Sequence, residues 1–295
     1  MSSSRKLVAI LGGRPYIDCL TLRVFLPPST RKELKALGID FIVATNNPIA
    51  AAQFESIDGL KVVRTTEKLH EEFMARQREV KPNLGAETRE TINQYAIENN
   101  YDFVVHLDDN IKSLFYYHDK KNRMVKNCKP KAMLDIITLL FNSIEKSNLG
   151  ALGIEMSAFA PSHRGTNISS GFPYSLFVHR VDKAFKFENA TEDDILMSIY
   201  NGQNNKPSGV IRNALLYSKT GKKSKAGGNR KMYEELLKGN KRGEYVSLMF
   251  PDIYSRKVSY NVKSSTIQKD PFLQHKHLLK SQSLGIKQWN TTKIF

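Results

Sequence analysis

The feature that most constrains this chain is a regular alternation of strand-like and helix-like segments over its first two-thirds. The short apolar runs typical of strands are Lys6–Leu11, Phe41–Ala44, Leu60–Val63 and Phe103–Leu107. The segments with helical spacing of apolar residues are Asp18–Leu26, Ala86–Asn99 and Ala132–Ile144. Such alternation predicts an α/β fold with a mostly parallel, Rossmann-like sheet that helices cover on both faces.

Polar loops follow three of the predicted strands. They are Gly13-Arg14 after the first strand, Thr45-Asn46-Asn47 after the second, and Asp108-Asp109-Asn110 after the fourth. In open α/β sheets, ligands bind beyond the carboxyl ends of the strands. The sequence therefore predicts a nucleotide or phosphate site where these loops meet.

The pair Asp108-Asp109 is the most unusual of these loops, because it places two like charges directly after an apolar run. Adjacent carboxylates repel each other unless a positive group lies against them or both point into water. Hard divalent cations such as Mg²⁺ are commonly held by one or two carboxylates together with substrate phosphates. A solvated turn is the alternative, since Asp and Asn are ordinary loop residues. In both cases we expect Asp109 to be solvated and to contribute little to packing.

A second acidic group, Glu192-Asp193-Asp194, lies at the start of a predicted helix over Thr191–Tyr200. Acidic residues stabilise a helix N-terminus, and this would be sufficient reason for their presence. Alternatively, one of them is a general base that holds an acceptor hydroxyl. Two acidic groups about eighty residues apart, on opposite sides of a nucleotide-type fold, suggest group transfer from a nucleotide-activated donor.

The positive charge of the chain is concentrated in its last third. Of a net charge of +16, residues 203–295 carry +14, from 19 Lys or Arg against 5 Asp or Glu. We therefore expect a core over residues 1–202 and a basic region over residues 203–295. Such a region suits a polyanion, because neutralising phosphates releases counterions, although a solvated tail has the same composition. The basic cluster predicted to contact such a polyanion is Lys222, Lys223, Lys225, Arg230 and Lys231. The aromatic residues that could stack on bases, if the polyanion is a nucleic acid, are Tyr217, Tyr233, Tyr245, Tyr254, Tyr260 and Trp289.

The remaining composition indicates an intracellular, cytoplasmic protein without a membrane anchor. The chain has two cysteines, Cys19 and Cys128, which excludes a disulfide scaffold. No apolar stretch approaches the roughly 20 residues that span a bilayer, and the N-terminus lacks the pattern of a cleavable signal.

Several motifs together resemble a known enzyme family. A strand that ends in Asp-Asp-Asn, an Arg-bearing helix before it and a Glu-Asp-Asp after it resemble the GT-A glycosyltransferases. More narrowly, GGRPYIDCLTLR, ETRETINQ, VVHLDDNI, TEDDILMSIY and KAGGNRKMY resemble the bacteriophage glycosyltransferases associated with TET/JBP hydroxylases. Glycosylation of hydroxymethylated pyrimidines in DNA is ascribed to that family. The resemblance covers about residues 6–235.

This resemblance implies a role for each matching residue. Asp109 would be the metal ligand, and Asp108 would contact the donor or share the metal. Glu192 or Asp193 would face the acceptor. The nucleotide side would be lined by Arg14, Thr21, Arg23, Asn46 and Arg89, with Gly227, Gly228 and Asn229 as a loop near the phosphates. Asn110 stands where the family often has a further Asp, which leaves the register of the Asp-x-Asp motif open by one residue. His163, His275 and His277 are possible third metal ligands.

The expected function is a metal-dependent transfer of a sugar from a UDP-sugar to 5-hydroxymethylcytosine in DNA. The donor would be UDP-glucose or UDP-N-acetylglucosamine, and the metal Mn²⁺ or Mg²⁺. One alternative is an enzyme of the same fold that acts on a glycan, lipid or protein, or transfers a nucleotide. The other is a non-catalytic nucleic-acid-binding protein, which would need neither acidic group.

Overall fold

The computed structural model describes residues 4–14, 20–78, 82–118, 123–127, 129–156, 168–189, 192–218, 244–251, 254–261 and 266–273. The strands are β1 (Lys6–Leu11), β2 (Ile39–Thr45), β3 (Val62–Arg64), β4 (Phe103–Asp108), β5 (Ile111–His118), β6 (Arg123–Asn127), β7 (Ala151–Met156), β8 (Ile168–Ser170), β9 (Leu176–Arg180), β10 (Ser208–Ser218), β11 (Tyr254–Asn261) and β12 (Thr266–Leu273). The helices are α1 (Leu20–Phe25), α2 (Pro28–Ala36), α3 (Pro48–Glu55), α4 (Glu67–Ala75), α5 (Leu84–Glu98), α6 (Pro130–Glu145), α7 (Asp193–Gln203) and α9 (Glu244–Met249).

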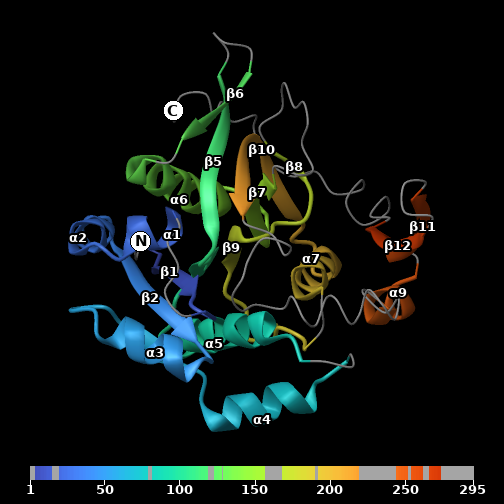
Figure 1. Ribbon diagram of the computed structural model, residues 1–295, viewed down its shortest axis with the longest axis horizontal. Helices are drawn as coiled ribbons and strands as arrows, with labels where there is room; N and C mark the ends of the chain where they lie inside the picture. Colours follow the sequence, from blue (N-terminus) through green and yellow to red (C-terminus); the bar gives the residue numbers. More distant parts are fainter. Residues whose placement is uncertain are drawn as a thin grey trace.

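A single large sheet forms the centre of the molecule (Figure 1). Its strands follow the order β3-β2-β1-β4-β9-β7-β10-β5-β6, and β8 pairs with β10 beside this path. The first four strands in this order are parallel to one another, as are β7 and β10. β9 runs antiparallel to both of its neighbours, and β5 runs antiparallel to β10. The predicted mostly parallel, Rossmann-like sheet is therefore confirmed, with antiparallel strands inserted into its second half.

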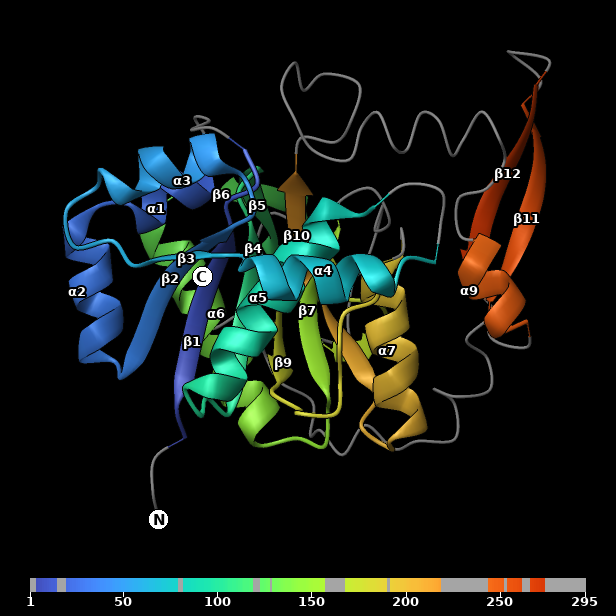
Figure 2. The ribbon, with the colours of Figure 1, turned by 90° about the horizontal axis from the view of Figure 1, so that it is seen from below.

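Helices cover both faces of this sheet, as the alternation predicted (Figure 2). Along β4, Val105 and Leu107 point to the face covered by α1, α2, α3 and α6. Val104 lies on the opposite face, which α5 covers. Further along the sheet, α7 packs on this second face through Met197. A strand buried on both faces needs apolar side chains in both directions, which explains the continuous apolar runs in the sequence.

Local sequence signals set the starts of the helices near the carboxyl ends of the strands. Asn47, Thr66 and Asn83 cap α3, α4 and α5 by accepting hydrogen bonds from backbone N–H groups of the first turn. β1 is followed by Gly12, where a Cβ atom would lie 2.7 Å from Cγ1 of Val43. This glycine therefore allows the loop after β1 to approach β2 closely.

Among the described residues after position 202, β10 and α9 contact the core. β10 lies beyond the expected boundary at residue 202 and is an integral strand of the main sheet. α9 packs against α7 through Val246, and Figures 1 and 2 both place α9 beside the β11–β12 hairpin. The division of the chain into two domains stays a prediction. In the part of the chain that the structure describes, no helix has the length and hydrophobicity needed to cross a bilayer.

Candidate functional site

The three polar loops predicted to meet at one edge of the sheet do so. β1 lies between β2 and β4, and Leu11 pairs with Asp108 at the end of both strands. The side-chain amide of Asn47 donates to the carbonyl oxygen of Gly13 at 3.3 Å, which joins the loops after β2 and β1. Thr21 on α1 donates its hydroxyl to the backbone oxygen of Asp108 at 2.8 Å. These contacts position the backbone at the carboxyl end of β4.

Asp109 is buried, contrary to the expectation of a solvated carboxylate. Asp109 is 3% exposed, and both of its carboxylate oxygens accept hydrogen bonds from the guanidinium of Arg14. Burial raises the pKa of Asp109 to about 6, although the adjacent Arg14 acts in the opposite direction. The positive group that relieves the repulsion at this position is therefore a guanidinium. Direct binding of a metal to Asp109 stays a prediction.

Asp108 is the more accessible carboxylate of the pair. Its side chain is 24% exposed, and its Oδ1 lies 3.4 Å from Nη2 of Arg89 on α5. Arg89 is buried. Asp108 thus combines a strand-end position with access to solvent, which a ligand of an incoming cation requires.

The second acidic group lies in the same site as the first, and not on the opposite side of the fold as predicted. Nη1 of Arg89 lies 3.5 Å from Oδ2 of Asp193, the first residue of α7. A single guanidinium therefore contacts one carboxylate from each acidic group. Sequence separation hid this proximity, which arises because one side chain of α5 contacts both the end of β4 and the start of α7.

Two asparagines that the sequence reasoning missed hold Asp193 in place. The side-chain amide of Asn83 donates to Oδ1 of Asp193 at 3.1 Å, while the backbone N–H of Asn83 donates to Asn189 at 2.8 Å. Burial raises the pKa of Asp193, and the charge of Arg89 opposes this rise. Burial together with the neighbouring Asp193 carboxylate raises the pKa of Asp194 well above its ordinary value. Glu192 is also buried.

The remaining predicted residues are brought to different places. Asn46 donates from its side-chain amide to buried Glu87 at 2.6 Å, and Glu87 also contacts His70 at 2.5 Å. Arg23 is exposed on α1, whereas Thr21 is buried, because residues two apart on a helix point to different sides. The predicted loop at Gly227, Gly228 and Asn229, the DNA-contacting cluster Lys222, Lys223, Lys225, Arg230 and Lys231, and the histidines His163, His275 and His277 lie outside the described residues.

Beneath Arg89, two buried histidines form a hydrogen-bonded pair. Nε2 of His106 lies 3.0 Å from Nε2 of His179, and Nδ1 of His179 contacts the backbone oxygen of Arg180 at 2.9 Å. A carbonyl oxygen only accepts, so Nδ1 of His179 carries the proton and its Nε2 accepts from His106. Burial lowers the pKa of His179 to about 4 and that of His106 well below its ordinary value. Both imidazoles are therefore neutral at physiological pH.

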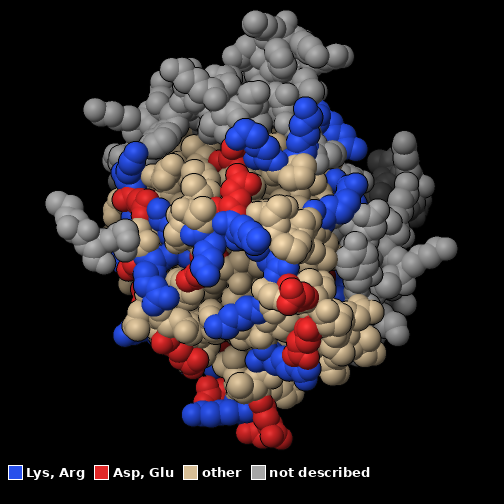
Figure 3. Space-filling view, turned by 90° about the vertical axis from the view of Figure 1, so that its left-hand side faces the viewer, with Lys and Arg blue, Asp and Glu red and all other residues tan. Residues whose placement is uncertain are grey.

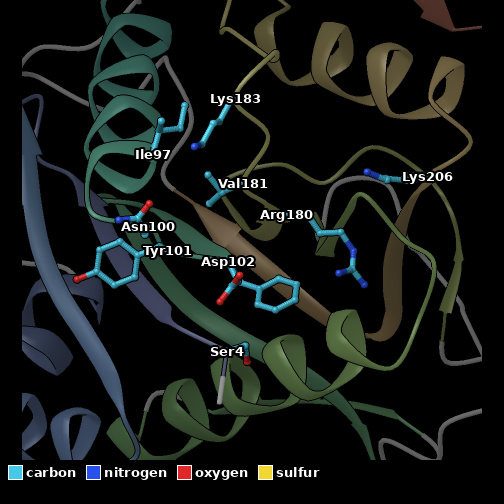
Figure 4. A pocket seen from close by; sticks show the side chains of 10 residues that line it. Ser4, Ile97, Asn100, Tyr101, Asp102, Arg180, Val181, Lys183 and Lys206 are labelled. Atoms are coloured by element: carbon cyan, nitrogen blue, oxygen red, sulfur yellow. The ribbon is translucent and has the colours of Figure 1, made fainter. Parts of the chain in front are cut away.

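A separate hollow of about 580 Å³ lies at the opposite edge of the sheet (Figure 4). Its lining includes Asp102, Lys183 and Lys206, and none of the predicted site residues. The guanidinium of Arg180 also lines it, but donates to the backbone oxygens of Ile144, Ser147 and Leu149 near the end of α6. The chemistry-bearing side chains therefore converge elsewhere, at the carboxyl ends of β1, β2 and β4.

No curated protein matches the chain. Among solved structures, it is similar to a protein described as a nucleotide-diphospho-sugar transferase from Desulfovibrio desulfuricans G20, with 10% identity, a TM-score of 0.38, and coverage of 71% of this chain and 80% of that one. It is also similar to a CMP:2-keto-3-deoxy-manno-octonic acid synthetase in complex with CTP, with 10% identity, a TM-score of 0.37, and coverage of 71% and 88%.

The family model named TET-Associated Glycosyltransferase matches residues 76–228, just over half of the 295-residue chain. The matched segment contains both acidic groups, Arg89, Asn83 and the histidine pair. On this evidence the chain belongs to the TET-associated glycosyltransferase family and is a glycosyltransferase.

Proposed function

We propose that this glycosyltransferase moves a sugar from a UDP-sugar, UDP-glucose or UDP-N-acetylglucosamine, to the hydroxymethyl group of 5-hydroxymethylcytosine in DNA. The observation that carries the proposal is the contact of Arg89 with both Asp108 and Asp193. This contact brings the two carboxylates into one site. Asp108, at the end of a strand, suits a donor diphosphate, and Asp193, at the start of a helix, suits an acceptor. Group transfer needs both substrates within bonding distance, and this arrangement supports that geometry.

Asp193 is the proposed general base. In the reaction, its carboxylate takes the proton of the acceptor hydroxyl while the hydroxyl oxygen forms a bond to C1 of the sugar. The bond from C1 to the diphosphate oxygen breaks, and the nucleoside diphosphate leaves with that electron pair. The raised pKa of Asp193 makes it a stronger base than an ordinary carboxylate. The hydrogen bond from Asn83 fixes the direction in which its other oxygen accepts a proton.

A divalent cation, Mn²⁺ or Mg²⁺, fits the donor end of this site. When bound, it would neutralise charge on the diphosphate, which an excess of carboxylates over guanidinium groups would otherwise repel. Asp108 is the residue that would hold it, because its carboxylate is partly exposed. No group of three or more metal-binding side chains occurs within the described ranges. Diphosphate oxygens and water would therefore complete the coordination, as is usual for Mg²⁺.

Two features support DNA as the acceptor. Residues 203–295 carry a net charge of +14, whereas basic and acidic side chains are interspersed over the face of the molecule that Figure 3 shows. In addition, α9 from this basic region packs against α7, the helix that begins with Asp193. This contact joins α9 to the helix that carries the proposed base, which supports an acceptor site bordered by the basic region. The cluster from Lys222 to Lys231 and the loop from Gly227 to Asn229 are proposed to contact DNA and donor phosphates, respectively.

The acceptor hydroxyl has to leave the base stack to reach Asp193. Extrusion of a base from duplex DNA costs a few kcal/mol, and contacts of a basic region with the phosphate backbone can offset this cost. A neutral glycan needs no such region, so the charge distribution favours DNA over that acceptor.

The test is mass analysis of nucleosides from DNA incubated with the enzyme and Mn²⁺. DNA that contains 5-hydroxymethylcytosine is offered with UDP-glucose, UDP-N-acetylglucosamine or other nucleotide sugars in turn. We expect one donor to add the mass of its sugar to the modified nucleoside, while matched DNA with unmodified cytosine stays unchanged. Transfer to a glycan or lipid acceptor, with every DNA left unmodified, would overturn the proposed acceptor.

A further inference from the structure

Arg89 is the residue through which the two ends of the site contact each other. Its Nη2 faces Asp108 at 3.4 Å and its Nη1 faces Asp193 at 3.5 Å, so two carboxylates share one positive charge. The Arg89 side chain is 9% exposed, and burial strengthens such interactions relative to the surface. Any change in the charge of one carboxylate therefore alters the hold of Arg89 on the other.

The position of Arg89 is fixed from below by an aromatic platform, which consists of Phe177, His106 and His179. The guanidinium carbon lies 5.2 Å from the ring centre of Phe177, within the range of a cation–π contact. His106 stacks on Phe177 at 5.0 Å and also contacts His179. Because both imidazoles are neutral, the aromatic platform supports the guanidinium without repelling it.

The same helix that carries Arg89 also determines where Asp193 lies. α5 begins directly after Asn83, whose side-chain oxygen accepts from the N–H groups of Gly85 and Ala86. The amide nitrogen of Asn83 donates to Asp193, so the start of α5 and the start of α7 are joined by a side chain that serves both. Arg89 and Asp193 therefore lie within reach of each other when the donor end is empty.

We propose that Arg89 is a positioning residue that couples the donor end to the acceptor end of the site, by moving from its hydrogen bond with Asp108 and its ion pair with Asp193 to the incoming diphosphate. The inference rests on the proposed function, because it assumes that a nucleotide diphosphate binds next to Asp108. Occupation of the donor end draws Arg89 away from Asp193, which leaves the carboxylate of Asp193 more basic when the acceptor arrives.

The coupling has a consequence that can be measured without catalysis. Neutralising Asp193 removes one of the two anions that compete for Arg89. The Arg89 guanidinium can then donate stronger hydrogen bonds to a diphosphate that binds beside Asp108. The variant Asp193→Asn should therefore bind UDP about five-fold or more tightly in metal-free buffer, as expected for coupled sites. In the Arg89→Met background, the same substitution should change UDP affinity by less than two-fold.

Two controls separate coupling through Arg89 from a general electrostatic effect. Glu192→Gln removes a buried negative charge next to Asp193, and its effect on UDP affinity should be the same with Arg89 or Met at position 89. Arg89→Lys keeps the positive charge, but one ammonium group does not reproduce the planar guanidinium that faces two carboxylates with separate nitrogens. We expect Arg89→Lys to retain most UDP affinity and to lose the response to Asp193→Asn.

Urea unfolding supplies a readout that does not depend on any ligand. In the presence of Arg89, the double variant Asp108→Asn, Asp193→Asn should lower the urea midpoint by more than the two single changes combined, because the guanidinium then loses both anions. With Met at position 89, Asp193→Asn should raise the midpoint by relieving an unpaired buried charge, and Asp108→Asn should change it little because Asp108 is partly exposed.

The coupling would be overturned if the shifts in urea midpoint were additive both with Arg89 and with Met at position 89. It would also be overturned if Asp193→Asn changed UDP affinity equally in these two backgrounds. Failure of the proposed function is distinguishable, because it appears as absent sugar transfer and absent UDP binding by the unsubstituted enzyme. In that event the unfolding measurements still decide whether Arg89 couples the two carboxylates.

Discussion

Replacing Arg14 with Met should destabilise the protein in a strongly pH-dependent way. The substitution removes the guanidinium from the buried carboxylate of Asp109 and leaves an apolar side chain of similar length. Loss of one partner of a buried ion pair typically costs about 3–5 kcal/mol when the remaining charge has no other outlet. Asp109 can avoid part of this cost, because its carboxylate can take up a proton and become neutral.

The size of the effect follows from the pKa of Asp109. With Arg14 present, a pKa of about 6 instead of 3.8 means that the ionised carboxylate already destabilises the folded state by about 3 kcal/mol at pH 7.5. Without Arg14, the greatest possible penalty is that of a carboxyl group that stays protonated when folded, about 5 kcal/mol at this pH. The Arg14→Met variant should therefore be less stable by up to about 2 kcal/mol.

The direction of the pH dependence is fixed by the same reasoning. Removing Arg14 raises the folded pKa of Asp109 further, so the folded variant binds a proton that the unfolded chain releases. Stability relative to the unsubstituted protein is then lost as pH rises above about 6, and the difference disappears below about pH 5, where both folded proteins are protonated. The appropriate assay is urea unfolding followed by circular dichroism at pH values from 5 to 8.

The chain offers a matched control in the pair of Arg64 and Glu55, which also forms an Arg–carboxylate ion pair but lies on the surface. Arg64→Met should change stability little, with no rise in the deficit between pH 6 and 8, because exposed pairs are screened by water. The double variant Arg14→Met, Asp109→Asn should recover the stability lost at pH 7.5. An Arg14→Met variant whose deficit is the same at pH 5 and pH 7.5 would refute the reasoning.

Three further outcomes are expected. Asp193→Asn should lower the turnover rate about 10²- to 10⁴-fold if Asp193 is the base, whereas unchanged turnover would reduce its role to a favourable helix-start charge. Because the pKa of His179 is lowered, the protein should lose about 3 kcal/mol of stability as pH falls from 6.5 to 4. In the His179→Phe variant the urea midpoint should fall less steeply over this pH range, and an unchanged dependence of the midpoint on pH would contradict a neutral His179. Replacing Lys222, Lys223 and Lys225 with Gln should reduce the slope of log DNA affinity against log salt concentration by about two to three units, while UDP-sugar hydrolysis stays unaffected. Equal slopes for the variant and the unsubstituted protein would exclude this cluster as the DNA contact.

The strand-and-helix alternation was sufficient to predict the part of the fold that places the donor end of the site. Continuous apolar runs such as Phe103–Leu107 identify strands buried on both faces, and short polar loops after them identify one edge of a parallel sheet. The predicted meeting of Arg14, Asn46 and Asp108 near this edge depends on the parallel pairing of β1 with β2 and of β1 with β4. Such pairing is the usual result of right-handed crossovers.

Burial of the charged groups was not predictable in the same way. A carboxylate after a strand is usually solvated, and nothing within a few residues of Asp109 indicates a buried partner. Arg14 reaches it from a loop 95 positions earlier in the chain. Whether a strand-end carboxylate faces water or a guanidinium depends on where the loop after β1 places Arg14, and residues close to Asp109 in the sequence do not determine this.

The link between the two acidic groups depends on a register that the alternation does not determine. β9 is inserted antiparallel between β4 and β7, and it pairs His106 with Phe177 and Val104 with His179. This register makes His106 and His179 diagonal neighbours on the face that α5 covers, within reach of each other. A shift of β9 by one residue would turn Phe177 and His179 to the opposite face and remove the aromatic platform. Arg89 would then lack the surface that holds it between two carboxylates, so the acceptor end of the site depends on a strand pairing made over more than seventy residues.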